Sequence, residues 1–334
     1  ISKKDDEILT SEFEKYACKF YNINTLKISI LSTFSVIKVL LIERPQIVHA
    51  HGKGGAFYAF FSSIFLFKPA KIVYTMHGYN NKFDGLKFYM YTFFEKIFST
   101  LVDRHIAVSA SERRKFLTEL AFAEEQVIVI ENGISVEEKK LNKRQMLILG
   151  RSSYNIVTFS RISPQKDLET MLHSFSELLK KPNKKSIALH IIGGHIDGDK
   201  AYLKKILALH KSLKLENNVI FWDDLPFASS FLQYFDLYWS TALWEGLPTA
   251  IIESMLKKIL VVSTDVVGNI DLVNVNTGIL TPVKDHHKIA EKLHSAIGAN
   301  NDTLVENAFV FATNNFSSEQ YKLKICSLYR EVAL

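Results

Sequence analysis

Residues 237–264 read LYWSTALWEGLPTAIIESMLKKILVVST, and this stretch decides the fold. It begins and ends with short runs of aromatic and β-branched residues, 237–240 and 259–264, which are typical of buried strands. The apolar side chains between them, such as Ile251 and Met255, recur on one helical face and predict a buried helix. A strand, a helix and a second strand in this order form the unit from which parallel sheets are built.

The same alternation of short apolar runs and longer helical patterns continues along the chain. In the first half, strands are predicted at 46–51, 71–78, 104–110 and 126–133. In the second half they are predicted at 155–160, 187–194, 218–222, 237–240, 259–264 and 278–282. The first-half runs end in polar or glycine residues. A doubly wound sheet places its ligand crevice at these strand ends. The sequence therefore predicts an α/β protein with two doubly wound domains.

A charged stretch separates the two halves. Residues 136–145, VEEKKLNKRQ, show no apolar period, and the chain of 334 residues is too long for one compact core. We expect an amino-terminal domain at 1–140 and a carboxy-terminal domain at 141–334. The chain opens with polar residues and no initiator Met, so we expect part of the amino terminus to be absent, and no secretory signal is visible.

Composition narrows the class of protein. Hydrophobic residues make up 47% and charged residues 23%, which are globular values. Cys18 and Cys326 have neither metal nor disulfide spacing, which fits a reducing compartment and predicts a cytoplasmic location. The most apolar run, 54–67, is too short to span a bilayer. Nucleic acid is not an expected partner, because no binding motif is present and the aromatic residues lie inside apolar runs.

Charge is unevenly distributed between the halves. The net charge is +6, and residues 1–145 hold 21 Lys and Arg against 16 Asp and Glu. This surplus favours an anionic surface or partner for the first half, although an ordinary solvated face explains it equally well.

Two glutamates lie eight positions apart across the start of the helix in the opening stretch. Pro248 suits the first helical position, and a helix amino terminus attracts phosphate. A ligand lying across that end would meet Glu245 on one side and Glu253 on the other. Arg161 and Lys166 follow the first strand of the second domain, at the same sheet edge, where two cations can hold a diphosphate. Taken singly, each of these residues is more often a surface charge or a good helix former.

These motifs together resemble the retaining nucleotide-sugar glycosyltransferases of glycosyltransferase family 4. The resemblance implies the GT-B fold of two facing Rossmann-like domains and runs from about residue 46 to about 330. It rests on the Glu245 and Glu253 spacing, the Arg161 to Lys166 loop, IIGG at 191–194, VVSTDVVG at 261–268, TGILTP at 277–282 and NFSSEQYKLKICSLY at 315–329. The family members in question build bacterial surface polysaccharide and lipopolysaccharide.

The resemblance also implies roles for single residues. Glu245 resembles the residue that binds hydroxyls of the donor sugar, and Glu253 the one that binds the nucleotide ribose. Arg161 and Lys166 resemble the diphosphate clamp. His77 is similar to a histidine that faces the sugar from the other domain, although a histidine after a strand can also be structural. The remaining donor-binding candidates surround the helix start: Gly246, Leu247, Pro248 and Thr249.

The sequence departs from the family pattern in two places. Asn269 and Asp271 stand where the family usually has a glycine followed by Glu, which leaves the contribution of this loop open. Relative to the family, we expect the first domain of this chain to lack the opening strand and the glycine-rich loop. The last helix is expected to pack back on the first domain.

Several weaker signals concern acceptor and metal binding. His51, Gly52 and Lys53 are acceptor-side candidates, although they also fit a plain strand-to-helix loop. His49 and His51 alternate along a strand and are expected to point to opposite faces. The Asp-x-Asp spacing at 197–199 resembles a metal motif, but its turn-forming neighbours favour a solvated turn. The resemblance implies catalysis without metal, so we expect no metal and no cofactor.

Two further features concern helices of the first half. Ser109 is expected to cap the helix that begins near Ser111. The aromatic stretch 86–104 fits core packing, and it also fits an interfacial element that lies against a membrane. Contact with an anionic membrane, at the inner face of the cytoplasmic membrane, is therefore a secondary expectation.

The sequence as a whole predicts an enzyme that moves a hexose-type sugar from a nucleoside diphosphate sugar to a glycan or lipid-linked hydroxyl, with retention. Two alternatives stay open. A nucleotide-sugar 2-epimerase of GT-B fold would need no acceptor, and a non-catalytic remnant would bind donor and make no product.

Overall fold

The computed structural model describes residues 19, 21, 23, 29–68, 70–78, 85–135, 142–150, 152–182, 185–194, 200–222, 225 and 228–334. The chain divides into two compact units. The first contains the residues up to Ile130 together with Leu323–Leu334, and the second contains Glu131–Lys322. The expected boundary at 140/141 lies ten residues later in the chain than this division.

The described part of the first unit is built around a parallel sheet with the order β1-β2-β3-β4. Its strands are β1 (Ile47–His51), β2 (Lys71–Thr75), β3 (Arg104–Ala107) and β4 (Val127–Val129). Its helices are α2 (Ile30–Glu43), α3 (Gly52–Phe65), α4 (Leu86–Ser99) and α5 (Ala110–Glu119). The core between helices and sheet contains Ala56, Tyr74, Phe98 and Phe116, all buried. The predicted strands 46–51, 71–78, 104–110 and 126–133 are each confirmed, with ends that differ by up to four residues.

The second unit contains a six-stranded parallel sheet with the order β10-β9-β8-β5-β6-β7. The strands are β5 (Tyr154–Phe159), β6 (Ile187–Ile192), β7 (Val219–Trp222), β8 (Leu237–Ser240), β9 (Leu260–Thr264) and β10 (Ile279–Thr281). The sequence predicted all six. The order reverses at β5, whose neighbours are β6 on one side and β8 on the other, as in a doubly wound sheet.

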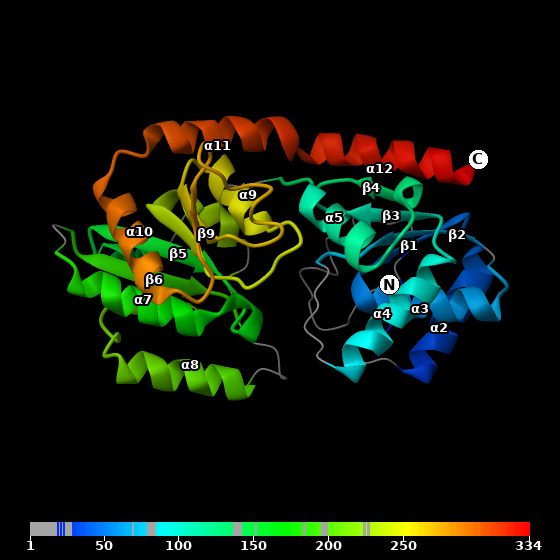
Figure 1. The fold of residues 1–334 in the computed structure, drawn as a ribbon, viewed down its shortest axis with the longest axis horizontal. Coiled ribbons are helices and arrows are strands. Elements are labelled where there is room, and N and C mark those ends of the chain that lie inside the picture. Colours follow the sequence, from blue (N-terminus) through cyan, green and yellow to red (C-terminus); the bar gives the residue numbers. More distant parts are fainter. Residues whose placement is uncertain are drawn as a thin grey trace. The chain divides into compact units, whose positions relative to one another are not determined.

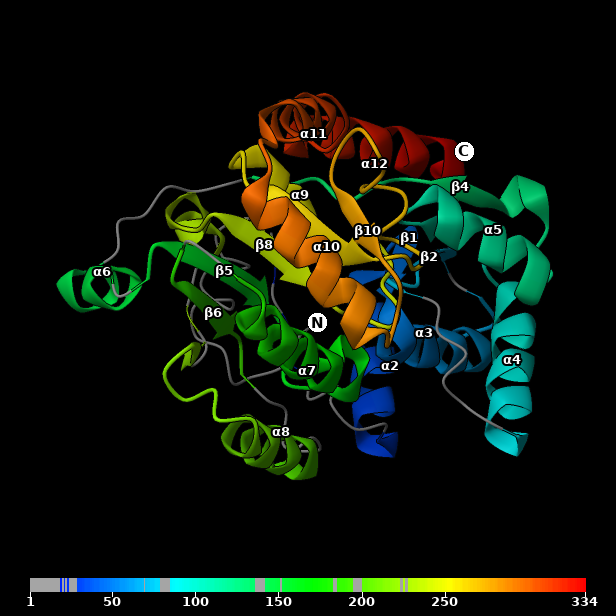
Figure 2. The same cartoon turned by 60° about the vertical axis from the view of Figure 1, so that its left-hand side comes forward.

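Helices cover both faces of this second sheet (Figure 1). One face carries α7 (Leu168–Lys180), α8 (Lys200–Ser212) and α10 (His286–Gly298), and the other carries α9 (Thr249–Leu256) and α11 (Asp302–Asn315). Figure 2 shows the same two layers from another side. The unit also contains the short α6 (Lys143–Leu149). The core under α7 and α10 includes Leu172, Phe175 and Leu293, all with no exposed surface.

The final helix, α12 (Ser318–Ala333), contributes residues to both units. Its last turns belong to the first unit, where Tyr329 bonds to His49 and Glu331 to Arg104. Among the described helices, none is both long and apolar enough to cross a membrane.

Candidate active site

The carboxyl edge of the second sheet brings the predicted donor-site loops together. Strands β5 and β8 are neighbours, so the loop after β5 lies beside the loop after β8. The short 3₁₀ helix at Pro164–Lys166 is held there by two bonds. The backbone N–H of Leu243 donates to Gln165 O at 2.9 Å, and Gln165 Nε2 donates to Trp244 O at 2.9 Å. Gln165 thus joins the two loops, a role that the sequence did not indicate.

Lys166 and Glu245 form an ion pair at the centre of this edge. Lys166 Nζ lies 2.5 Å from Glu245 Oε1, and the two side chains are only 19% and 11% exposed. Thr241 Oγ1 donates to Lys166 O at 2.8 Å and holds the backbone on the lysine side. The sequence had assigned the lysine to the diphosphate and the glutamate to the sugar separately. Arg161, on the same loop as Lys166, is exposed to solvent.

Two glycines allow the loops to approach each other closely. Gly268 has φ +87°, and a Cβ at this position would lie 2.5 Å from Gly246 O. The backbone N–H of Glu245 donates to Val267 O at 3.2 Å, so a hydrogen bond joins Glu245 to the loop after β9. Gly193, from the IIGG motif, has φ +138° and would place a Cβ 2.7 Å from Ser160 O. The motif glycines therefore shape the site through close backbone packing.

Asn269, which departs from the family pattern, is fully buried in the same loop. Its Nδ2 donates to Thr264 O at 2.9 Å, and Thr264 Oγ1 donates to Ala242 O at 2.5 Å. Asn269 therefore helps to tie the loop after β9 to the loop after β8. These bonds give Asn269 a structural role in the loop.

Helix α9 begins one residue later than predicted. Pro248 is its N-cap residue, with φ −73° and ψ 107°, and Thr249 is the first helical residue. The expectation that Pro248 occupies the first helical position is therefore wrong by one residue, because its ψ remains extended. Thr249 is exposed, whereas Leu247 is buried.

Glu253 lies in the second turn of α9 and is half-buried. Burial raises the pKa of its carboxyl group, and a hydrogen bond with Ser229 opposes this effect. A carboxylate held in partly apolar surroundings favours a partner that donates hydrogen bonds, such as a hydroxyl group.

The first unit places a group of histidines at the carboxyl edge of its sheet. In the β1–β2 pairing His51 is opposite Thr75, so His77 follows close to His51. His51 Nδ1 lies 2.8 Å from His77 Nε2, and the two rings are stacked with centroids 5.1 Å apart. His77 has φ +57°. Desolvation and then the charge of His51 lower the pKa of His77 to about 4, and desolvation lowers the pKa of His51.

The expectation that His49 and His51 point to opposite faces is wrong. Their rings are stacked with centroids 4.1 Å apart, because side chains two positions apart in a strand share a face. His49 is bonded on both ring nitrogens, to Thr75 Oγ1 at 2.8 Å and to Tyr329 OH at 2.5 Å. These two bonds fix the ring of His49, which stacks on His51, and His51 in turn contacts His77.

Lys53, an acceptor-side candidate, is turned toward helix α4. Its Nζ lies 4.1 Å from the centre of the Tyr91 ring, and burial lowers the pKa of the lysine while Glu95 raises it. Glu95 is fully buried, and Tyr74 and Tyr91 lie next to its carboxyl group. Burial raises the pKa of Glu95 to about 7. Gly52, the residue before Lys53, has φ +62° at the start of α3, a backbone conformation that glycine adopts without strain.

Two residues of α5 support the same edge. Ser109 caps the helix by accepting from the N–H of Glu112 at 3.1 Å, which confirms the predicted cap. The buried Glu112 carboxylate accepts from the N–H of Gly78 at 2.6 Å and from the N–H of Val108 at 2.8 Å. Glu112 thereby fixes the turn that follows His77. No motif signal marked this residue, since its partners are backbone groups.

The aromatic stretch 86–104 is only partly core. Phe98 is buried in helix α4, but five large apolar side chains on the other side of the helix are exposed. They are Leu86, Tyr89, Met90, Phe93 and Ile97. The interpretation of the whole stretch as core packing is therefore wrong for this face. We call these five residues the α4 apolar face.

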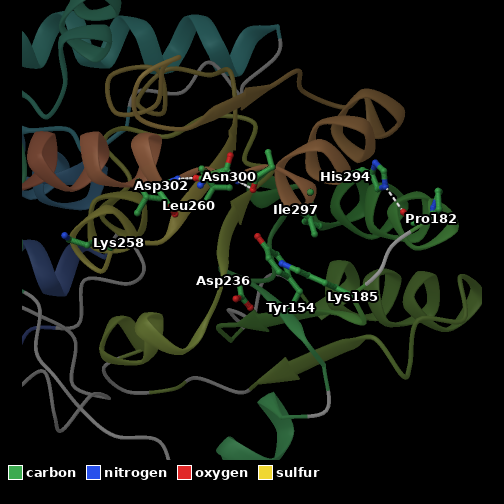
Figure 3. Close-up of a pocket in the computed structure, with 14 residues that line it drawn as sticks. Tyr154, Pro182, Lys185, Asp236, Lys258, Leu260, His294, Ile297, Asn300 and Asp302 are labelled. Carbon is green, nitrogen blue, oxygen red and sulfur yellow. Dashed lines mark hydrogen bonds between the residues drawn. The ribbon is translucent and has the colours of Figure 1, made fainter.

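A large polar cavity lies at the opposite end of the second sheet (Figure 3). Its volume is about 810 Å³, and its lining includes Tyr154 and Leu260, the first residues of β5 and β9, and Asp236, which precedes β8. Lys185 Nζ lies 4.6 Å from the Tyr154 ring centre, and Asp236 accepts from the N–H of Asn155. The cavity is therefore at the amino edge, whereas open α/β sheets bind ligands at the carboxyl edge. The Asp-x-Asp turn at 197–199 lies outside the described residues.

Comparison with known proteins links this geometry to a family. The profile described as "Glycosyl transferases group 1" matches residues 139–308, and the profile "Glycosyltransferase Family 4" matches residues 10–138. The chain is 24% identical over 311 residues to the capsular polysaccharide biosynthesis glycosyltransferase CapM of Staphylococcus aureus, covering 88% of this chain and 80% of CapM. It is 25% identical over 292 residues to an Escherichia coli UDP-Gal:alpha-D-GlcNAc-diphosphoundecaprenol alpha-1,3-galactosyltransferase, covering 84% and 73%.

Solved structures share the fold at lower identity. Anabaena HepE in complex with UDP and glucose superposes with a TM-score of 0.81 at 20% identity, covering 98% of this chain and 90% of HepE. Sucrose-phosphate synthase of Thermosynechococcus elongatus gives a TM-score of 0.79 at 16% identity, covering 93% and 82%. The two parallel-sheet α/β units therefore have the GT-B architecture, as predicted.

Proposed function

The chain belongs to the glycosyl transferases group 1 family, and we propose that it moves a sugar from a nucleoside diphosphate sugar to a hydroxyl with retention at the anomeric carbon. The observation that carries this proposal is the pairing of Lys166 with Glu245 beside the start of α9. A cation and a carboxylate held together at a sheet's carboxyl edge suit a ligand that is anionic at one end and rich in hydroxyls at the other.

The chemistry requires charge stabilisation at the diphosphate. As the bond from the anomeric carbon to the diphosphate oxygen breaks, its electron pair stays on the diphosphate. Arg161, Lys166 and the backbone N–H groups at the start of α9 supply positive charge for it. The acceptor oxygen forms the new bond to the anomeric carbon, and its proton passes to the leaving diphosphate oxygen. In this proposal these cations suffice, so the transfer needs no metal and no cofactor.

The carboxylates orient the donor. Glu245 accepts hydrogen bonds from sugar hydroxyls while it remains paired with Lys166, and Glu253 accepts from the ribose. Gly246 and Leu247, in the loop held by Gly268, bring backbone groups to the donor, and the exposed Thr249 offers a hydroxyl there. These roles stand on the family resemblance and on the position of the loops.

The proposal also gives roles to residues of the first unit. His77 keeps the catalytic role that the resemblance implies, with His51 bonded to its ring. The lowered pKa of His77 keeps the imidazole neutral at pH 7 and makes it a weak base, so it acts through hydrogen bonds to the donor. His51, Gly52 and Lys53 are assigned to the acceptor side.

The relatives suggest the donor and the acceptor. HepE was solved with UDP and glucose, and the E. coli relative is named for UDP-Gal and for an acceptor linked to diphosphoundecaprenol. We therefore assign a UDP-hexose donor and a lipid-linked glycan acceptor, in the assembly of a capsule or O-antigen type polysaccharide.

The α4 apolar face fits a lipid-linked acceptor. Phe93 is 66% exposed, and Lys96 lies in the last turn of the same helix. Exposed apolar side chains with a nearby cation are typical of helices that lie in the headgroup region of an anionic bilayer. The proposal therefore includes peripheral contact of this face with the cytoplasmic membrane surface.

Calorimetric titration with UDP-, GDP- and ADP-sugars tests the donor site. We expect binding of one nucleotide class without added metal, with at least about tenfold loss in Arg161→Ala and in Glu253→Ala. Glu216→Ala is the matched control, because Glu216 precedes β7 at the amino edge. Equal binding by all four proteins would refute the donor site.

Product analysis tests the reaction. Transfer with retention gives a glycoside whose anomeric configuration, read by NMR, matches that of the donor. An epimerised nucleotide sugar formed without acceptor would support the 2-epimerase alternative instead, and tight donor binding with no product would support the non-catalytic remnant.

Vesicle binding tests the membrane contact. We expect the protein to sediment with vesicles that contain anionic lipid, and Met90→Ser/Phe93→Ser to reduce the bound fraction severalfold. Leu207→Ser is the control, since Leu207 is an exposed apolar residue of α8 in the second unit. Equal reduction by the control would contradict a specific role for the α4 apolar face.

A further inference from the structure

A cluster of metal-ligating side chains lies between helices α7 and α10 of the second unit, separate from the candidate donor site. It contains Glu177 of α7 with His286 and His287 at the start of α10. One ligand atom from each residue lies within 4.8 Å of the others. The proposed transfer reaction uses none of these residues, so the cluster calls for its own explanation.

The distances within the cluster suit a small metal ion. His286 Nε2 lies 3.3 Å from Glu177 Oε1, and His287 Nδ1 lies 2.7 Å from Glu177 Oε2. Ligands at zinc bond lengths of about 2.1 Å in a tetrahedron lie about 3.4 Å from each other. The distance from His286 to Glu177 Oε1 is close to this value, whereas His287 contacts the other carboxylate oxygen, Oε2. His287 is 73% exposed, so its ring can move outward by the small amount that the second distance requires.

A fourth ligand candidate lies on the same helix as the glutamate. His173 is four residues before Glu177, so the two share one face of α7. The ring centroid of His173 is 5.6 Å from that of His286, and the centroids of His286 and His287 are 4.2 Å apart. His173 therefore lies beside His286, one of the two imidazoles that contact the Glu177 carboxylate.

We propose that Glu177, His286 and His287, with His173 beside them, form a structural binding site for a divalent transition metal of the zinc type. Imidazole nitrogen with one carboxylate is a ligand set that Zn²⁺ prefers. Mg²⁺ and Ca²⁺ prefer oxygen ligands and fit this set poorly.

The neighbouring charges leave the site open to a cation. Asp285 is the N-cap residue of α10, and its Oδ2 lies 3.5 Å from Lys288 Nζ. The positive end of the α10 dipole opposes a bound cation, but the Glu177 carboxylate lies within hydrogen-bond distance of both imidazoles. The anionic ligand and the Asp285 cap offset the dipole.

A metal here would fasten α10 to α7. The two helices already pack along their lengths, and His294, two turns further along α10, bonds to Pro182 O just after α7. Helix α7 begins at Leu168, directly after the loop of Lys166. The site would therefore stabilise the helix that carries the candidate diphosphate loop, without taking part in the transfer.

Zinc binding by the tag-free, EDTA-treated full chain tests this proposal. We expect one Zn²⁺ per chain by competition with a chromophoric chelator, and a rise in the melting temperature on addition of Zn²⁺. The double variant His286→Ala/His287→Ala should bind Zn²⁺ at least about 100-fold more weakly and lose the thermal shift. Removal of a residue that only supports a ligand costs about 10–100-fold in metal affinity, and removal of the ligands themselves costs more. His294→Ala, on the same helix, should behave as the wild type.

Cobalt gives a second readout that does not depend on stability. Co²⁺ in a tetrahedral site absorbs visible light strongly, and this band should appear in the wild type and in His294→Ala but not in the double variant. The proposal is overturned if the wild type binds no Zn²⁺ in competition with the chelator. It is also overturned if the double variant retains wild-type affinity, which would place the bound metal elsewhere.

Discussion

The ion pair between Lys166 and Glu245 should be measurable as a coupling energy. At 2.5 Å and an effective dielectric constant of about 20, the Coulomb attraction is about 7 kcal/mol. Side chains that are 19% and 11% exposed lose most of their hydration, which costs several kcal/mol per ion and offsets much of this gain. We therefore expect a net coupling of about 2 kcal/mol.

A double-mutant cycle isolates this coupling. Lys166→Met and Glu245→Gln should each lower the free energy of unfolding by about 2–3 kcal/mol, because each leaves one partly buried polar group without its partner. The double variant should lose about 3 kcal/mol in total and not the sum of both. Urea unfolding at pH 7 and low salt, repeated at about 1 M salt, measures the three values. Strictly additive losses would refute the idea that the pair organises the loops.

Three further predictions follow from single residues. Gly268→Ala should lower the free energy of unfolding by about 2–4 kcal/mol and weaken donor binding in calorimetry, because its Cβ would lie 2.5 Å from Gly246 O. Gly298 has open space around it, so Gly298→Ala, the control, should be nearly neutral or slightly stabilising. The folded-state pKa of Glu95 is raised to about 7, so the stability of the wild type falls as pH rises from about 4.5 through 7. In urea titrations, Glu95→Gln should therefore be up to about 3 kcal/mol more stable than the wild type at pH 8 but not at pH 4. Burial lowers the pKa of His105 to about 3, so the stability of the wild type falls as pH drops below about 6.5. Phenylalanine can keep the stacking of this ring on Phe122. In the same assay, His105→Phe should be about 2 kcal/mol more stable than the wild type at pH 5 but not at pH 7.5.

The strands were predictable because parallel strands buried on both faces read as continuous apolar runs. Ile187–Ile192 is buried throughout, and the sequence IALHII shows it without any alternation. Helix ends were harder. Pro248 was placed one residue too far into α9, because a proline fits both the N-cap and the first helical position and only ψ distinguishes them.

Much of the candidate site depends on contacts that sequence spacing does not encode. Lys166 and Glu245 are 79 residues apart, and their pairing follows only from the adjacency of β5 and β8. The same limit applies to Glu177 and His286, which meet through the packing of α7 on α10. The error over His49 and His51 was different in kind, since the period of a strand alone places them on one face.

The α4 apolar face shows a further limit. Phe93 and Phe98 belong to one aromatic stretch, yet Phe93 is exposed and Phe98 is buried. A helix with apolar residues around most of its circumference gives no sequence signal for which side meets the protein.

The division of the chain has a consequence for how the protein folds during synthesis. The first unit is completed by Leu323–Leu334, whose Tyr329 bonds to His49, so its last contacts wait until the whole second unit has left the ribosome. Roughly 190 residues separate the two parts, which at about 5–20 residues per second is a delay of about 10–40 s. During that interval the first unit lacks the bond between Tyr329 and His49 and the ion pair between Glu331 and Arg104.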